Sequence, residues 1–112
     1  MQPKDAPTNR FRARVFAALS DPARIDIIEF LGEAEKCVCE ITPHLGLVQP
    51  VVSRHLKILR DCGLVRCRKE GNRRLYSITD PRALDVVDAL TPELLEALSK
   101  RAIEQMTMVK AE

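Results

Sequence analysis

The 112-residue sequence has no apolar run long enough to cross a membrane, since a spanning helix needs about 20 mainly apolar residues. The first fifteen residues, MQPKDAPTNRFRARV, also lack the apolar centre of a secretory signal. We therefore expect a cytoplasmic protein without membrane contact. Thiols are kept reduced in that compartment, so the four cysteines are expected to act as ligands, redox groups or packing residues rather than as structural disulfides.

Signatures of enzymes are missing as well. There is no Gly-rich phosphate loop and no Ser/His/Asp pattern. The carboxylates of Asp85, Asp88, Glu93 and Glu96 lie on predicted helices without histidine partners, which is typical of solvated helix faces. Internal repeats and low-complexity segments are absent too. With 46% apolar and 30% charged residues, the chain reads as one globular domain that is not an enzyme.

The net charge is only +2, but it is unevenly distributed. Residues 53–74 carry eight Lys or Arg against two acids, which leaves ten basic and fourteen acidic residues elsewhere. A basic centre in an otherwise acidic chain indicates a polyanionic partner such as nucleic acid.

The stretch Ile41–Gly63 predicts two short helices joined by a tight turn at residues 45–47. At about 100° per residue, Val52, Leu56 and Leu59 form one apolar face of the second helix. Polar and basic side chains that suit base edges and phosphates lie away from it: Gln49, Ser53, Arg54, Lys57 and Arg60. This pattern favours a helix-turn-helix whose second helix reads the DNA major groove. The alternative is an ordinary solvated helix face.

Residues 64–69 and 73–78 alternate in polarity around Glu70-Gly71-Asn72, which predicts a β-hairpin. A hairpin directly after a recognition helix has the position of the wing in a winged helix. Four basic residues near its tip would contact phosphates or a minor groove: Arg68, Lys69, Arg73 and Arg74. The alternative is a solvated hairpin.

The remaining segments complete a mainly α fold with a small β-hairpin. We expect a flexible arm at residues 1–8 and a domain at 9–112, with the helix-turn-helix at about 40–62, the wing at about 64–78 and C-terminal helices at about 81–108. A helix over 23–31 is expected to bury Ile25, Ile28 and Leu31.

Two terminal helices carry apolar faces that suit self-association. The first is marked by Phe11, Val15 and Leu19, and the last by Leu95, Leu98, Ala102, Met106 and Val109. A terminal amphipathic helix without a covering layer commonly pairs with a copy of itself, so we expect a homodimer through these helices. Packing of the two helices within one chain is the alternative.

Cys37 and Cys39 stand just before the helix-turn-helix. Thiolates select soft ions such as As(III), Sb(III), Cd(II), Zn(II) or Cu(I). Residues i and i+2 of a helix point about 200° apart, so one ion can bind both sulfurs only if the first helical turn unwinds or the segment is not helical. Two small buried side chains, or a redox pair in a strained ring, are alternatives.

The other sulfur and imidazole groups have less specific settings. Cys62 and Cys67 lie among apolar neighbours and are expected to pack. His44 is expected at the surface, although its nitrogen could serve a metal site near the cysteines, and His55 is expected to be half-buried.

Three segments together resemble the ArsR/SmtB family of metal-sensing repressors: residues 18–31 (ALSDPARIDIIEFL), 37–41 (CVCEI) and 51–78 (VVSRHLKILRDCGLVRCRKEGNRRLYSI). The resemblance implies a homodimeric winged helix that binds operator DNA when metal-free and releases it when metal binds. The CVC stretch is similar to that of arsenic(III) and antimony(III) sensors, which places the metal ligands at Cys37 and Cys39.

The chain departs from that pattern in informative ways. Arsenic sensors with this motif often have a third cysteine where this chain has Thr42. The last helix has no histidine, which argues against the family's zinc, cobalt and nickel site. The segment before Phe11 has no cysteine, which argues against its cadmium and lead site.

The sequence thus predicts a repressor of an inverted-repeat operator, released when As(III), Sb(III) or another soft ion binds Cys37 and Cys39. One alternative is a repressor of the same fold whose thiols sense oxidants or persulfides. Another is a thiol-based metal carrier or enzyme without DNA binding.

Overall fold

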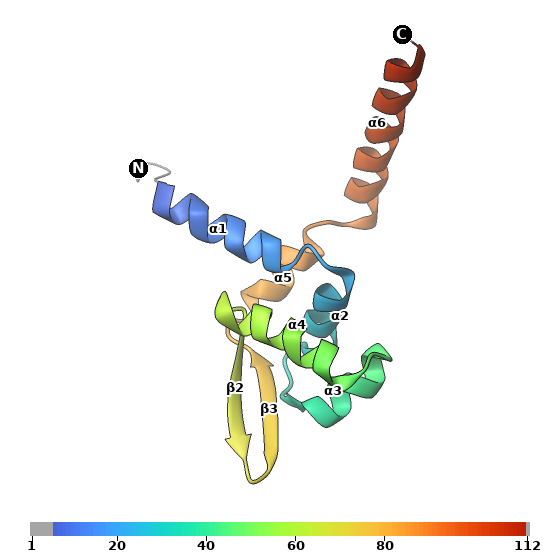
Figure 1. The fold of residues 1–112 in the computed structure, drawn as a ribbon. Coiled ribbons are helices and arrows are strands. Elements are labelled where there is room, and N and C mark those ends of the chain that lie inside the picture. Colours follow the sequence, from blue (N-terminus) through green and yellow to red (C-terminus); the bar gives the residue numbers. More distant parts are fainter. Residues whose placement is uncertain (1–5, 112) are drawn as a thin grey trace.

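The computed structural model describes residues 6–111 (Figure 1). Along the chain its elements are α1 (Ala6–Ala18), α2 (Pro22–Leu31), β1 (Lys36–Cys37), α3 (Val38–Leu45), α4 (Gln49–Asp61), β2 (Val65–Glu70), β3 (Arg73–Ile78), α5 (Arg82–Asp88) and α6 (Pro92–Ala111). The helix-turn-helix and the hairpin therefore occur where the sequence predicts them.

The antiparallel sheet has three strands in the order β1-β3-β2. The predicted hairpin pairs Val65 with Ile78 at one end and Glu70 with Arg73 at the other. The third strand was not predicted, because two residues carry no periodic pattern. It pairs Lys36 with Tyr76 and Cys37 with Leu75, which fixes the cysteine segment to the edge of the wing.

Local signals set the ends of the helices. Asp21 begins α2 by accepting a hydrogen bond from the Ala23 N–H at 2.8 Å, and Pro22 suits the first helical position. Gly46 ends α3 with φ of 67°, and its N–H donates to the Thr42 carbonyl at 3.1 Å. This left-handed conformation makes the tight turn between α3 and α4.

The core lies where α2, α3, α4 and the sheet meet. Val52, Leu56 and Leu59 are fully buried, as the helical pattern predicts. On α2 the pattern was partly wrong: Ile27 is fully buried while Ile25 is half-buried. This helix is covered by α3, α4 and β3 together, so its buried surface is wider than a single stripe.

The first helix begins earlier than predicted. Residues 6–8, assigned to a flexible arm, belong to α1, because Pro7 is compatible with a first helical turn. Residues 1–5 of that arm lie outside the described part.

The two terminal helices extend away from the core in different directions (Figure 1). Every side chain described on α6, through Met108, is exposed, and Phe11 on α1 is 53% exposed. The two apolar faces thus do not cover each other within the chain; the Val109 side chain lies outside the described set. No described helix combines the length and apolarity needed to cross a membrane.

Truncation of the buried face of α4 should destabilise the domain. We expect Leu56→Ala to lower the free energy of unfolding by about 2–5 kcal/mol, because it leaves a cavity in the core. Ile58→Ala removes an aliphatic side chain that is 42% exposed on the same helix and should cost no more than about 1 kcal/mol. Urea denaturation at matched protein concentration measures both; equal losses would contradict this packing.

Candidate DNA interface and thiol site

Helix α4, the predicted recognition helix, divides its residues between core and solvent. Opposite the buried face lie the exposed side chains proposed from the sequence to contact DNA: Gln49, Ser53, Arg54, Lys57 and Arg60. Lys57 forms an ion pair with Asp61 one turn later, with Nζ 2.8 Å from Oδ2. Exposed pairs of this kind are weak and break easily, so Lys57 can still reach a phosphate.

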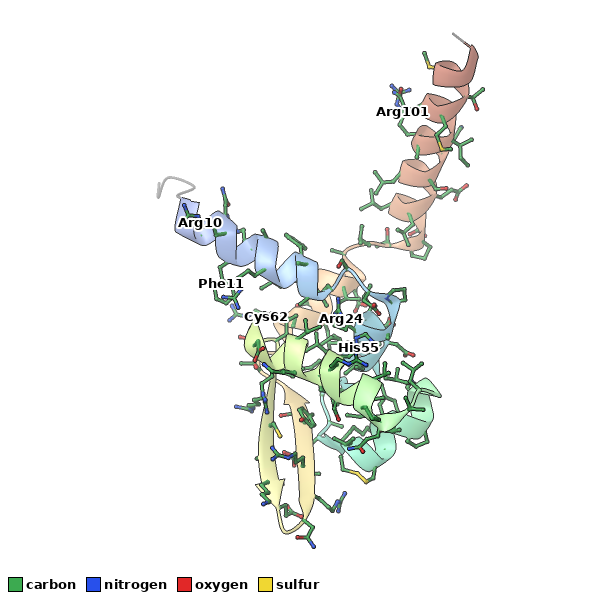
Figure 2. All side chains as sticks on the ribbon, viewed as in Figure 1. Arg10, Phe11, Arg24, His55, Cys62 and Arg101 are labelled. Carbon is green, nitrogen blue, oxygen red and sulfur yellow. A yellow bond between two sulfur atoms is a disulfide. The ribbon has the colours of Figure 1, made fainter. Side chains whose placement is uncertain are left out.

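A histidine and an arginine position α4 against the preceding helices. The half-buried His55 has its Nδ1 3.0 Å from Arg24 Nη1, and Figure 2 shows the two residues together at this junction. Because the guanidinium can only donate, Nδ1 accepts and the ring proton lies on Nε2. Arg24 Nε also donates to the Ala18 carbonyl at 2.5 Å. His55 is therefore half-buried, as expected, and links α4 to the α1–α2 turn.

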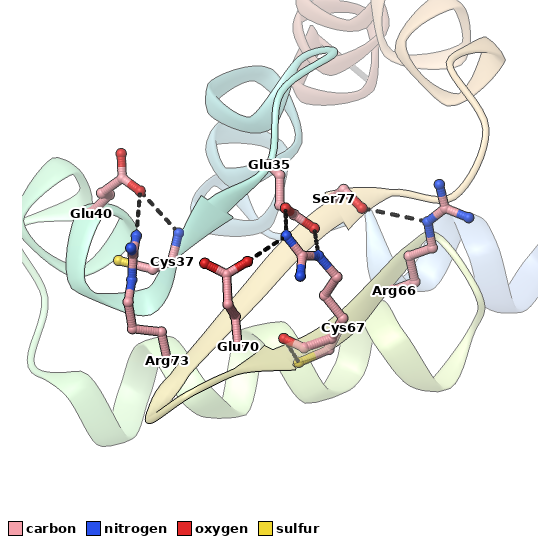
Figure 3. A network of polar contacts seen from close by, with 9 residues as sticks. Glu35, Cys37, Glu40, Arg66, Cys67, Glu70, Arg73 and Ser77 are labelled. Atoms are coloured by element: carbon pink, nitrogen blue, oxygen red, sulfur yellow. Dashed lines mark hydrogen bonds and ion pairs between the residues drawn. The ribbon is translucent and has the colours of Figure 1, made fainter.

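Arg68 on β2 is held by carboxylates. Its guanidinium donates two hydrogen bonds to Glu35, both 2.7 Å long, and lies 2.9 Å from Glu70 (Figure 3). The hydrogen bond from Arg68 is the main cause that lowers the pKa of Glu35, and the two carboxylates raise the pKa of Arg68. From the sequence, this arginine was expected to contact phosphates or a minor groove, and its carboxylate partners were not predicted.

The rest of the wing tip is more open. Lys69, Arg73 and Arg74 are exposed. Arg73 Nη2 lies 3.9 Å from Glu40 Oε1 on α3. The side chains of Lys69 and Arg74 form no hydrogen bond or ion pair with the residues described here. Both are thus available for a polyanion.

Cys37 and Cys39 are joined by a disulfide, with their Cα atoms 5.1 Å apart. The expectation that all four cysteines are reduced is therefore not met at this pair. Cys37 precedes α3 in an extended conformation, φ −83° and ψ 160°, while Cys39 lies in the first turn. The 200° separation of a regular helix does not apply, so the sulfurs meet without unwinding of α3. Cys37 is buried and Cys39 is exposed.

The paired sulfurs lie in a hollow of about 300 Å³ between the elements that the sequence predicts to contact DNA. Its walls come from the cysteine segment, the start of α4 and the wing tip: Cys37, Val38, Cys39, Gln49, Asn72, Arg73 and Arg74. Within residues 6–111 no group of three or more His, Cys, Asp or Glu side chains is arranged to hold a metal. The site thus consists of two sulfurs that meet at one point, with the arginines Arg73 and Arg74 in the same hollow.

The other candidate ligands lie apart from this hollow. His44 is exposed, stacks on Phe30 with ring centroids 3.9 Å apart, and has Nε2 3.2 Å from Asp26. Cys62 is buried and Cys67 packs beside the core, which agrees with their predicted packing roles. Thr42 stands where the resemblance to arsenic sensors would place a third cysteine; its hydroxyl is buried and has no hydrogen-bond partner in the described part of the chain.

A helix-turn-helix with an exposed basic recognition helix, followed by a basic hairpin, defines a winged helix-turn-helix transcriptional regulator that binds DNA. Residues 21–66 match the model of the bacterial regulatory protein, arsR family. The chain is 38% identical over 100 residues to the probable mercury resistance operon repressor of Streptomyces lividans, an alignment that covers 89% of this chain and 78% of that one. The chain therefore belongs to the arsR family of regulators, and the alternative of an enzyme is wrong.

Two further comparisons agree with this assignment. The arsenical resistance operon repressor of Staphylococcus aureus is 34% identical, with 68% of this chain and 73% of that protein aligned. The structure is similar, with a TM-score of 0.72 and 33% identity, to that of Rv0081 from Mycobacterium tuberculosis, over 88% of this chain and 99% of that one.

A third comparison concerns a winged helix-turn-helix DNA-binding domain from Mycobacterium bovis that is described as homodimeric. The TM-score is 0.75 with 30% identity, over 87% of this chain and 93% of that one.

Sequence reasoning missed the acidic partners of the wing. Glu35 precedes β1 and Glu40 lies in the first turn of α3, and both contact arginines more than thirty residues away. The sequence does contain one signal: residues 33–40 have more acidic than basic side chains, and residues 66–74 have more basic than acidic ones. That balance indicates attraction between the segments but not which residues meet.

The Glu35–Arg68 contact gives a pH-dependent signature. Because the folded-state pKa of Glu35 lies below its ordinary value, the contact stabilises the fold above that ordinary value and is lost as the pH falls through the lowered pKa. A ¹³C NMR titration of the glutamate carboxyls should show a lowered pKa for Glu35 that moves up in Arg68→Gln. Arg66→Gln, which removes only a weaker Coulombic effect, should move it less; no change in Arg68→Gln would refute the contact.

Proposed function

We propose that the protein is a homodimeric transcriptional repressor that binds an inverted-repeat operator and releases it when As(III), Sb(III) or another soft ion binds Cys37 and Cys39. The observation that carries this proposal is the position of the two sulfurs, in one hollow with the first residue of α4 and the wing arginines. An occupant of that hollow touches both elements that would contact DNA.

DNA recognition would divide between α4 and the wing. Gln49, Ser53, Arg54 and Lys57 are suited to base edges and nearby phosphates, with Arg60 at the flank. Arg68, Lys69, Arg73 and Arg74 would contact the backbone or a minor groove. Because such contacts release counterions, affinity should fall steeply with salt. A two-fold dimer places half-sites about one helical turn apart.

The dimer would form through α1 and α6. The exposed apolar side chains of α6 include Leu94, Leu95, Leu98, Ile103 and Met106. An apolar groove of about 670 Å³ also lies between α1 and α5, lined mainly by Phe11, Val15, Phe16 and Val86. Apolar surface of this extent on a small domain is typical of an interaction face, and the relative described as homodimeric supports a dimer.

Ion capture needs no third protein ligand. With the disulfide reduced to two thiols, As(OH)₃ would exchange two As–O bonds for two As–S bonds to Cys37 and Cys39, releasing two water molecules and keeping one hydroxide. The site thus supplies two soft donors, and Thr42 need not act as the third. The mercury and arsenical resistance repressors among the relatives support a soft-ion inducer.

A thiol-redox sensor of the same fold is the second candidate, and the Cys37–Cys39 disulfide favours it. Formation of that bond removes two electrons and two protons from the thiols. Diamide, a diazene, can accept them and become a hydrazine. The exposed Cys39 sulfur is the accessible one of the pair. A sensor of this kind would release DNA after oxidation without any metal.

Disruption of the apolar face of α6 should separate the subunits. We expect Leu98→Glu to shift the protein to a monomer in sedimentation velocity, because each interface would bury two new carboxylates. Ser99→Glu adds the same charge at the next exposed position and should remain dimeric. Identical behaviour of the two variants would argue against an interface on this face.

Arsenite should release operator-bound protein through the paired sulfurs. In a fluorescence-anisotropy titration on DNA from the protein's own upstream region, we expect arsenite to weaken binding of the wild type at least tenfold. Cys37→Ser and Cys39→Ser should bind DNA but lose this response, since one thiolate cannot chelate. Cys67→Ser serves as the control and should respond like the wild type.

The same experiment separates the two candidates. Release by diamide in the absence of arsenite, with a disulfide found by mass spectrometry, would favour the redox sensor. If the double variant Cys37→Ser/Cys39→Ser released DNA with arsenite and with diamide as the wild type does, sensing at this pair would be ruled out.

A further inference from the structure

One carboxylate bridges the thiol site and the wing. Glu40 is the third residue of α3, and its Oε1 accepts a hydrogen bond from the Cys37 backbone N–H at 3.1 Å. The same oxygen lies 3.9 Å from Nη2 of Arg73 (Figure 3). A single side chain therefore contacts both the residue that carries a candidate ligand sulfur and an arginine at the wing tip.

A second carboxylate holds the wing without touching the sulfurs. Glu35 precedes β1 in the chain and binds Arg68, and it has no hydrogen bond to Cys37 or Cys39 among the described residues. The wing is thus held by two glutamates on either side of one short strand. Only Glu40 is also bonded to the cysteine segment.

Building on the proposed function, we propose that Glu40 is the positioning residue that transmits the state of Cys37 and Cys39 to the wing. When the sulfurs are joined, either to each other or through an ion, Cys37 is fixed and Glu40 is held against Arg73. When both are free thiols, Cys37 can rotate at the start of α3, Glu40 moves with it, and Arg73 is released to bind a DNA phosphate.

The direction of this effect follows from competition for the guanidinium. The structure has the sulfurs joined and Arg73 beside Glu40, which is the arrangement expected for the released repressor. A carboxylate and a phosphate use the same donors of an arginine. Holding Arg73 against Glu40 therefore removes one phosphate contact from each subunit, and two from a dimer.

The contact can respond to small movements. Cys37 is paired with Leu75 in the sheet, two residues from Arg73, so the cysteine and the arginine are also joined through the backbone of β3. The ion pair itself is long at 3.9 Å and exposed, and contacts of this kind are easily exchanged for others. A small change at the sulfurs is therefore enough to alter which anion Arg73 binds.

The number of phosphate contacts can be measured from the dependence of operator affinity on salt. Each contact contributes about −0.9 to the slope of log K against log salt concentration. We expect the dithiol dimer of the wild type to have a slope steeper by about 1.8 than the arsenite-loaded or diamide-oxidised dimer. Titrations begin at low salt so that both forms bind.

Glu40→Gln tests the carboxylate itself. Glutamine can still accept the hydrogen bond from the Cys37 N–H, which preserves the start of α3, but it carries no charge to hold Arg73. We expect this variant to bind arsenite, as seen by mass spectrometry, and to show the same steep slope in both states. Glu35→Gln is the matched control. Its affinity for operator DNA changes, but the slope difference of about 1.8 between the dithiol state and the arsenite-loaded or oxidised state remains.

Arg73→Gln approaches the contact from the wing. It should have the shallow slope in both states, because the arginine that changes partner is gone. It also provides the test if Glu40→Gln does not fold.

The outcomes distinguish this inference from the function on which it rests. A wild type that keeps its DNA affinity with arsenite and with diamide would overturn the proposed sensing function. The role of Glu40 alone would be overturned if the wild type lost DNA affinity with arsenite or diamide and Glu40→Gln still showed the full slope difference between the two states. If Glu40→Gln does not fold, the same result with Arg73→Gln would overturn it.

Discussion

The pairing of β1 with β3 is the constraint on which the site depends. Two residues, Lys36 and Cys37, join the edge of the wing hairpin, and this short ladder brings a segment far from the wing in sequence into contact with it. Without it, Glu35 and Glu40 would have no fixed relation to the arginines of β2 and β3. The burial of Cys37 follows from the same pairing.

This constraint also explains why the two sulfurs meet. A residue in a strand must be extended, so Cys37 cannot belong to the first turn of α3, and the helix begins one residue later. A cysteine pair separated by one residue is thus divided between a strand and a helix. The geometric objection to a C-x-C pair on a helix is removed by the strand.

The sequence predicted those features that repeat along the chain or lie in local contacts. The apolar stripe of α4 and the alternation of the hairpin each involve several residues, and Asp21-Pro22 marks a helix start by itself. It did not predict β1, because two residues cannot show a period, nor the pairing of Glu35 with Arg68, because that depends on how two distant segments pack. On α2, Ile27 was not among the residues expected to be buried, and it is buried because α3, α4 and β3 all pack against that helix.

The carboxylates that bind the wing arginines also change how the positive charge of the wing should be interpreted. Eight basic residues between positions 53 and 74 indicate a polyanion partner, but a guanidinium already bound by a carboxylate contributes less to that attraction than a free one. Arg68 is neutralised from two sides and Arg73 from one, while Arg74 and Lys69 face solvent. The charge that DNA meets is therefore set by the acidic residues around β1 as much as by the count of arginines. Because one of those acids is bonded to Cys37, sulfur chemistry can change the effective charge of the wing while the sequence and the fold stay the same.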